Sequence, residues 1–333
     1  MTSILERAEG ALIGLAIGDA LGMPTQQLSR QAVAQRWGAI TTFEAPDPAH
    51  PLAHGLRAGS VTDDTELALM LARHLVARRG AIDARHLAAE LVEWEDGMRA
   101  RGSHDLLGPS TKAAVEAVAS GTPVTESGRF GATNGAAMRI AAVGIANDFD
   151  SIPRLVDAVV AASAVTHNTG VALSGAAAVA AAVSAGIEGA TFEQAAAVAG
   201  DAAREGSSRG HWVAAGDVAR RIGVAVALGS TDDIARGERD IYELIGTSLA
   251  TQESVPAAFG LLALHDGDPW LACLAAASLG GDSDTIGAMA GAIGGALRGV
   301  DGFPHQARRT VLEVNSFGAT EFRDLAAALL ELR

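Results

Sequence analysis

Aromatic side chains are scarce in this 333-residue sequence, which holds 8 Phe, 4 Trp and 1 Tyr. The core must therefore be built from Ala, Val, Leu and Ile. Alanine is the best helix former, whereas sheets favour β-branched and aromatic residues. The many alanine-rich tracts thus predict an all-α fold: a compact orthogonal bundle of a dozen or more helices that pack closely through small side chains.

Helix-forming patterns recur along the whole chain. Residues 4–21 carry apolar side chains at helical spacing, and the pattern stops at Gly22. Thr62 is placed to cap a helix whose first turn is acidic, and the Pro- and His-containing segment 45–59 before it is typical of a loop. Further helices are predicted at residues 84–100, 111–119, 152–164, 171–185, 192–205, 213–228, 241–247, 255–263, 269–279, 285–297 and 321–332. No linker or tandem repeat divides the chain, so residues 1–333 are predicted to form a single domain.

The sequence is acidic, with 25 Lys and Arg against 39 Asp and Glu and a formal net charge of −14. No basic patch stands out, so we expect no nucleic-acid partner. Glu6 and Glu9 stand where a signal peptide carries basic residues. The longest nearly uncharged stretch, residues 158–187, carries polar side chains among Ala and Gly, and we predict that its hydrophobicity is too low for a membrane span. We expect a soluble cytoplasmic protein without a membrane partner, and the sequence indicates no oligomeric state.

Two predicted helix starts share an acidic pattern. Residues 62–65 read Thr-Asp-Asp-Thr, and residues 282–285 read Asp-Ser-Asp-Thr after two glycines. Ordinary capping explains either segment alone. Neighbouring side chains in a helix diverge by about 100°, so Asp63 and Asp64 are suited to different ions, or to one ion and the backbone. Four carboxylates in one cleft repel unless cations neutralise them, and oxygen ligands favour Mg²⁺, Mn²⁺ or Ca²⁺ over Zn²⁺.

A third acidic segment tests this reasoning. Residues 230–233 read Ser-Thr-Asp-Asp, but no hydroxyl follows them. We interpret this segment as a plain helix cap or surface turn. The three-residue string Thr-Asp-Asp is therefore weak evidence for a site by itself.

Four motifs in order carry a family resemblance: Gly-Asp-Ala-Leu-Gly at 18–22, Thr-Asp-Asp-Thr at 62–65, Asn-Gly-Ala-Ala-Met-Arg at 134–139 and Gly-Asp-Ser-Asp-Thr-Ile-Gly at 281–287. Together they resemble the ADP-ribosylglycohydrolase family, with a match from about residue 8 to residue 300. The resemblance implies an all-α single domain with two divalent cations, Mg²⁺ or Mn²⁺, in a cleft. It also implies hydrolysis of an N- or O-glycosidic bond at the anomeric carbon of ribose.

The resemblance also implies roles for the acidic residues. Thr62, Asp63 and Asp284 resemble ligands of one metal. Asp282, Asp284 and Thr285 resemble ligands of the other metal, with Asp284 bridging, and Asp64 joins the site. Asp63 and Asp64 are the expected catalytic carboxylates.

Substrate-binding residues follow in the same way. Asn134 and Gly135 resemble the part that receives the ribose and phosphates. His167 matches a position where the family often has a site histidine, although a core histidine satisfied by backbone groups is the alternative. Gly108 and Ser110 lie at a predicted helix start whose amides could receive an anion, and a simple N-cap explains them equally well.

Two departures from the family pattern bear on the substrate. Gln26 stands where the family commonly has Glu, and a neutral amide cannot act as a general base. The catalytic base is then expected to be a metal-bound water together with Asp63 or Asp64. Ala132 stands where some relatives place an aromatic residue. The remaining aromatic candidates, Phe130, Trp212 and Tyr242, are better explained by core or surface packing, and the substrate could be smaller than protein-linked ADP-ribose.

These observations leave several functions open. The leading hypothesis is a metal-dependent ribosyl hydrolase acting on ADP-ribose linked to a protein or a small molecule. A nucleosidase-like N-ribosyl hydrolase with a smaller substrate is the variant. A non-catalytic nucleotide-binding relative is favoured by Gln26 but disfavoured by the four intact aspartates. A metal-free carboxylate glycosidase would need a carboxyl in an apolar pocket, which these Thr- and Ser-flanked acids do not resemble.

Overall fold

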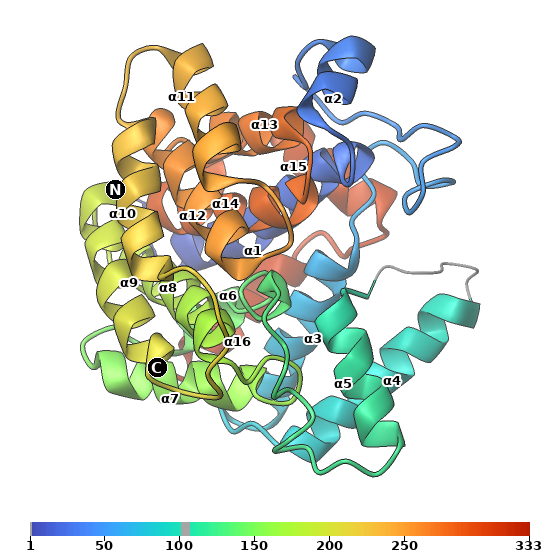
Figure 1. The fold of residues 1–333 in the computed structure, drawn as a ribbon, viewed down its shortest axis with the longest axis vertical. Helices are drawn as coiled ribbons and strands as arrows, with labels where there is room; N and C mark the ends of the chain where they lie inside the picture. Colours follow the sequence, from blue (N-terminus) through green and yellow to red (C-terminus); the bar gives the residue numbers. More distant parts are fainter. Residues whose placement is uncertain (1, 101–106) are drawn as a thin grey trace.

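The structure is a computed structural model that describes residues 2–100 and 107–333, and helices dominate this part of the chain (Figure 1). The α-helices are α1 (Ile4–Gly22), α2 (Arg30–Trp37), α3 (Asp63–Ala77), α4 (Ala84–Ala100), α5 (Pro109–Ala119), α6 (Ala141–Ala146), α7 (Ile152–Ser163), α8 (Gly170–Ile187), α9 (Phe192–Ser207), α10 (Val218–Gly229), α11 (Ile234–Asp240), α12 (Thr251–Leu264), α13 (Pro269–Leu279), α14 (Ser283–Arg298), α15 (His305–Val314) and α16 (Glu321–Leu330). Short helical turns are η1 (Met23–Thr25), η2 (Asn134–Ala136), η3 (Ile241–Ile245) and η4 (Val300–Gly302). Extended pairing in the described residues is limited to two isolated bridges, so the all-α prediction is confirmed.

Several predicted helix boundaries needed correction. The helix predicted from residue 213 begins at Val218, because the Asp217 side chain caps it by accepting from the Arg220 amide. The helix predicted at 241–247 is a five-residue π-helical turn that directly continues α11. Four short helices were missed, namely α2, α6, α11 and α15. In α2 only Val33 is buried, so its sequence lacks the apolar periodicity that reveals a helix.

Glycines bring α1 and α14 into backbone contact, and we call the contact of Gly14 and Gly18 with Gly291 and Gly287 the glycine seam. These antiparallel helices pass so closely that a Cβ added to Gly14 would lie 2.3 Å from the Gly291 carbonyl oxygen. One turn further on, a Cβ added to Gly18 would lie 1.9 Å from the Gly287 oxygen. Only glycine permits this backbone approach. The seam therefore fixes the C-terminal end of α1 against the first turn of α14.

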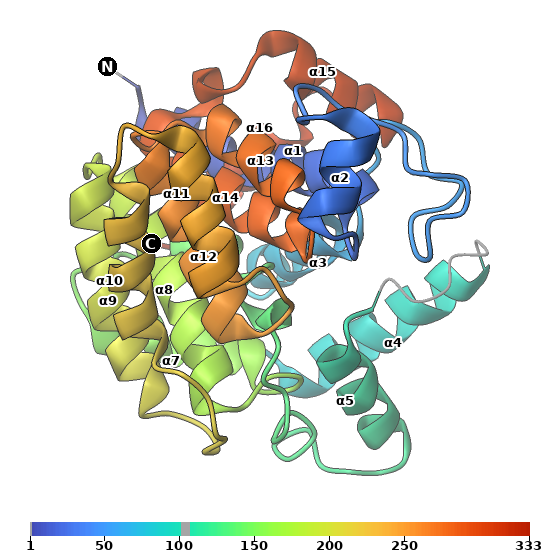
Figure 2. The same cartoon turned by 45° about the horizontal axis from the view of Figure 1, so that its top comes forward.

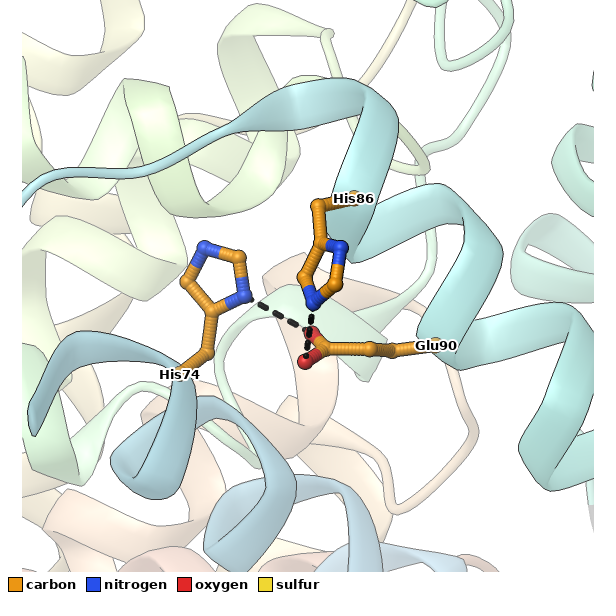
Figure 3. A group of neighbouring side chains, drawn as sticks. All are labelled: His74, His86 and Glu90. Atoms are coloured by element: carbon orange, nitrogen blue, oxygen red, sulfur yellow. Dashed lines mark hydrogen bonds and ion pairs between the residues drawn. The ribbon is translucent and has the colours of Figure 1, made fainter. Parts of the chain in front are cut away.

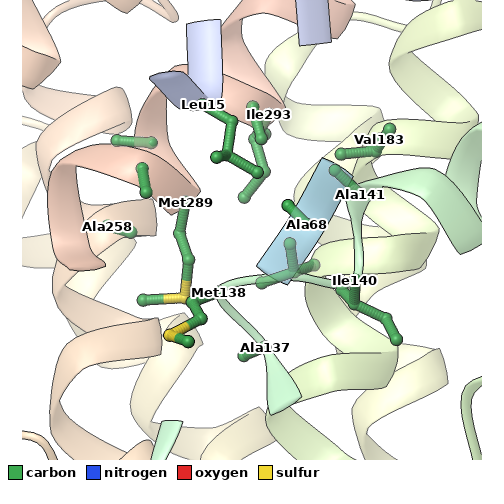
Figure 4. Close-up of a cluster of buried hydrophobic side chains, with 14 of the residues drawn as sticks. Leu15, Ala68, Ala137, Met138, Ile140, Ala141, Val183, Ala258, Met289 and Ile293 are labelled. Atoms are coloured by element: carbon green, nitrogen blue, oxygen red, sulfur yellow. The ribbon is translucent and has the colours of Figure 1, made fainter. Parts of the chain in front are cut away.

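The core around this pair consists of small and aliphatic side chains. Figure 4 shows Leu15 of α1 and Ile293 of α14 close to Ala68 of α3, with Met138 and Met289 filling the space below them. Most buried residues are Ala, Val, Leu or Ile, as the aromatic-poor sequence predicted.

Helix α8 corrects one sequence argument. Its 18 residues have a mean hydropathy of 1.8, so by length and composition this helix is apolar enough to cross a membrane, contrary to the prediction. In the structure 94% of the helix is buried inside the protein, against α9 and α14 among others. Burial, rather than polarity, marks α8 as a core helix.

Helices α4 and α5 form an arm at one side of the molecule. Figures 1 and 2 show both helices projecting away from the main bundle, next to α3. Helix α4 packs mainly on α3 and α5. The arm matters for the site because the first turn of α5 reaches it.

Candidate active site

A cavity of about 120 Å³ lies where α3 and α14 begin. It combines the two acidic segments that the sequence singled out, although more than two hundred residues separate them. The cavity-lining residues among those predicted for the site are Gln26, Asp63, Asp64, Gly108, Asn134, Gly135, Asp282, Asp284 and Thr285. The tertiary structure thus gathers nine predicted residues around one space.

Asp19 of α1 fixes the start of α3 through hydrogen bonds. Its fully buried carboxylate accepts the amide and hydroxyl of Thr62, at 2.9 and 2.8 Å. It also accepts the amide and hydroxyl of Thr65, at 3.1 and 2.5 Å. Burial raises the pKa of Asp19 to about 6, although these four donors oppose the shift. Asp19 is a positioning residue that the sequence analysis did not assign to the site, and its signal was a carboxylate in the last turn of an apolar helix.

The start of α14 is held in a different way. Gly280 and Gly281 adopt φ values of +70° and +69°, a left-handed conformation that favours glycine. This turn lets the Asp282 amide donate to the Thr247 carbonyl at 2.7 Å. The Asn134 amide donates to an Asp282 carboxylate oxygen at 2.5 Å and to the Ser254 hydroxyl at 2.9 Å.

The four carboxylates at the cavity are crowded and desolvated. Burial, followed by repulsion from Asp284 and Asp63, raises the pKa of Asp64 well above its ordinary value. Burial and repulsion from neighbouring aspartates likewise raise the pKa of Asp63 and Asp284, and burial raises that of Asp282. Such a cluster is unfavourable as four anions unless positive charge joins it.

Two buried atoms at the cavity have no hydrogen-bond partner, Asp64 Oδ1 and Gln26 Nε2. The other Asp64 oxygen accepts the Thr285 hydroxyl at 3.2 Å and lies 3.3 Å from the Thr62 hydroxyl oxygen, whose proton goes to Asp19. A buried polar atom without a partner is expensive, so its presence indicates a ligand. Oxygen donors from carboxylates and hydroxyls fit a hard divalent cation, and the residues present therefore fit the implied metals.

Three predicted site residues do not line the cavity. Thr62 is 1% exposed and its hydroxyl donates to Asp19, so it supports the acidic turn from beneath. Ser110 lies in the first turn of α5, whereas its neighbours Gly108 and Thr111 reach the cavity. Thr111 was missed because a hydroxyl inside a predicted helix gives no signal in the sequence.

His167 lies one layer behind the cavity. It is fully buried, its Nε2 lies 3.0 Å from the Thr133 hydroxyl, and its Nδ1 lies 2.8 Å from the Thr166 hydroxyl. Its ring also packs against Gly135, where an added Cβ would lie 2.9 Å from Cε1. Thr166 in turn accepts from the buried Arg139 guanidinium at 2.5 Å. His167 therefore supports the cavity wall and does not face the cavity itself.

Burial, aided by the nearby Arg139 charge, lowers the pKa of His167 well below 6.5. The unfolded chain then binds a proton below about pH 6.5 that the folded chain does not bind. We expect the free energy of unfolding to fall, through His167, by about 1.4 kcal/mol per pH unit below that point. The His167→Asn variant should lose this component of the slope in denaturant titrations at several pH values, whereas an unchanged slope would contradict a neutral buried His167.

The structure is thus an all-α protein whose candidate site is built between helices, with four buried aspartates at two convergent helix starts. Comparisons with known proteins identify the family. The sequence model of the ADP-ribosylglycohydrolase family matches residues 1–333. The chain therefore belongs to the ADP-ribosylglycohydrolase family, and it is a glycosidic hydrolase.

Three relatives illustrate the range of the family. The uncharacterized protein YegU of Escherichia coli is 34% identical, over 98% of this chain and 97% of its own length. The ADP-ribosylarginine hydrolase Tri1 of Pseudomonas putida is 30% identical, over 90% of this chain and 72% of its own. A solved chain of an ADP-ribosylglycohydrolase-related protein complex is similar with a TM-score of 0.72 and 26% identity, covering 100% of this chain and 99% of that one.

Proposed function

We propose that this chain, acting as one domain over residues 1–333, hydrolyses the glycosidic bond at the anomeric carbon of an ADP-ribosyl group on a protein or a small molecule. The observation that carries the proposal is the convergence of four desolvated aspartates, one with an unpartnered buried oxygen, in a single cavity. Relatives named for this chemistry, such as Tri1, an ADP-ribosylarginine hydrolase, support the same reaction class.

The proposed cofactors are two divalent cations, Mg²⁺ or Mn²⁺. Asp63 and Asp284 would hold one of them, and Thr62 would support this site through its hydrogen bond to Asp19. The other ion would be held by Asp64, Asp282, Asp284 and Thr285. When bound, such ions orient ribose hydroxyls and lower the pKa of a nearby water. The four aspartates also stabilise the positive charge that develops on ribose in an oxocarbenium-like transition state.

Within the acidic pair on α3, the two aspartates have different surroundings. Asp64 is 1% exposed, and one of its oxygens accepts the Thr285 hydroxyl. Asp63 is 8% exposed and lies at the cavity. We assign Asp63 the removal of a proton from the attacking water, since Gln26 cannot accept one at neutral pH. Asn134 orients Asp282, since both of its amide protons have acceptors, and Gly135 offers backbone to the ribose.

A smaller substrate is the second candidate. The cavity volume is below the roughly 300–1,000 Å³ of typical ligand pockets, and no aromatic side chain is among its described lining residues. Phe130 and Trp212 lie on the surface, 79% and 86% exposed, and neither lines the cavity. These features favour a substrate of which the cavity encloses little more than the ribosyl group, such as a nucleoside.

A substrate screen after chelation tests the proposal. Protein freed of metal should not hydrolyse ADP-ribosyl-arginine, ADP-ribosyl-serine or simple ribonucleosides, and Mg²⁺ or Mn²⁺ should restore activity on at least one of them. Each bound ion should raise the free energy of unfolding by about 2.7 kcal/mol at a hundred times its Kd. Activity that survives thorough chelation would overturn metal dependence. Activity on nucleosides alone would select the second candidate.

A further inference from the structure

A second cluster of metal-binding side chains lies away from the active site, between α3 and α4 (Figure 3). His74 comes from α3, and His86 and Glu90 lie one turn apart on α4. Two imidazoles point at the two oxygens of one carboxylate. His74 Nδ1 lies 2.7 Å from one Glu90 oxygen, and His86 Nε2 lies 3.1 Å from the other. Helix α3 rises about 1.5 Å per residue, so His74 is about 15 Å along the helix from Asp64.

The three side chains lie close enough together to reach one ion. One ligand atom of each residue lies within 4.8 Å of the others. A tetrahedral ion with bonds of about 2.0–2.1 Å holds its ligand atoms about 3.3 Å apart. The contacts of His74 and His86 with the two Glu90 oxygens, at 2.7 and 3.1 Å, must lengthen toward this value, and any wider separation, up to 4.8 Å, must shorten. Rotation of side chains on α4 can supply that adjustment, because the His86 side chain is 49% exposed and that of the half-buried Glu90 is 27% exposed.

The surroundings of the three residues also fit. The His74 side chain is fully buried and forms the inner wall, while the exposure of His86 leaves a path to solvent and room for a water ligand. Asp83 caps α4 by accepting the amides of Arg85 and His86, which fixes the first turn that carries His86. In the described part of the chain, the ion pairs of Glu90 are those with the two histidines.

We propose that His74, His86 and Glu90 form a Zn²⁺ site that fastens the α4–α5 arm to α3. Two imidazole nitrogens and one carboxylate favour Zn²⁺ and similar transition metals over Mg²⁺, so this site is chemically distinct from the all-oxygen aspartate cluster. Metal-free His74 accepts the Asp83 amide on Nε2 at 3.3 Å, so its Nδ1 carries the proton that Glu90 accepts. Binding through Nδ1 would move that proton to Nε2, so the Asp83 amide would lose its acceptor and face a second donor, and one of the two groups would have to turn aside.

The arm that the metal would fasten ends at the active-site cavity. Gly108, Pro109 and Thr111 at the start of α5 line that cavity, and α4 packs mainly on α3 and α5. A link between α3 and α4 therefore restrains the position of the first turn of α5. This proposal does not depend on the reaction catalysed at the aspartate cluster.

Calorimetric titration of Zn²⁺ into the full chain in excess Mg²⁺ tests the proposal. We expect the wild type to bind one equivalent more tightly than His86→Ala does, by at least about ten-fold in Kd. Co²⁺ should give a visible absorption band in the wild type that His86→Ala and Glu90→Gln lack. Glu93→Gln, an exposed change on the same helix, is the matched control and should bind like the wild type.

His86 is on the surface, so its substitution should leave the fold intact, and circular dichroism checks this. Equal Zn²⁺ affinity in the wild type and His86→Ala would overturn the proposal, as would a Co²⁺ band that persists in both variants. The cluster would then be a hydrogen-bonded link between α3 and α4. A failed substrate screen would leave the titration unaffected, so the two proposals can fail separately.

Discussion

Replacing Asp284 by Asn should lower kcat by at least about 100-fold, which steady-state kinetics on the best substrate of the screen would measure. Asp284 lies in the first turn of α14, lines the cavity, and is the carboxylate expected to bridge the two cations. The amide keeps the shape but removes the charge that both ions would share. Calorimetry should show weakened Mn²⁺ binding in the same variant.

A stability measurement distinguishes this result from misfolding. In chelated protein Asp284→Asn should be more stable than the wild type, because repulsion among the buried carboxylates decreases. Asp232→Asn is the matched control, since Asp232 is an exposed aspartate in the other Thr-Asp-Asp segment, and neither activity nor metal binding should change. Unchanged Mn²⁺ affinity in Asp284→Asn would show that the bridging assignment is wrong.

Gly18→Ala should lower the free energy of unfolding by about 3 kcal/mol or more, as measured by urea titration. The added methyl group would lie 1.9 Å from the Gly287 oxygen and 2.8 Å from the Ala288 nitrogen, and both are backbone atoms that cannot rotate aside. Helices α1 and α14 must then move apart. Because Asp19 follows Gly18 and Asp284 opens α14, activity should fall together with stability.

Gly223→Ala provides the matched control for that prediction. Gly223 lies on the exposed face of α10, and a Cβ there meets nothing within 4 Å. Alanine at such a helical position should raise stability by up to about 1 kcal/mol. Wild-type stability in Gly18→Ala would show that α1 and α14 can separate without penalty, and would refute the glycine seam as a determinant of the fold.

Much of the candidate site was predictable because most of its acidic residues occur in short sequence motifs. A pair of carboxylates flanked by hydroxyls is visible at residues 62–65 and again at 282–285, and both do begin helices around one cavity. The third segment, interpreted as a helix cap or surface turn, does cap a helix, since the Asp233 side chain accepts from the Arg236 amide at the start of α11, although α11 itself was not predicted.

Other features depended on contacts between distant segments. Nothing around residue 19 shows that its carboxylate accepts four hydrogen bonds from Thr62 and Thr65. The role of His167 could not be inferred either, because a buried wall residue and a substrate ligand have the same sequence signature. His74 and Glu90 are sixteen residues apart, and only the packing of α4 on α3 brings them together.

The amino-acid sequence by itself determined the helical class and the acidic helix starts, because helix propensity and end-capping act over a few neighbouring residues. Only the tertiary structure decided which atoms meet in the cavity. Glycines spaced one turn apart on α1 and α14 bring two backbones into contact, and this contact sets the geometry between Asp19 and Asp284. Which helices make such contacts depends on how all the core side chains pack together, because a close-packed core leaves room for one arrangement.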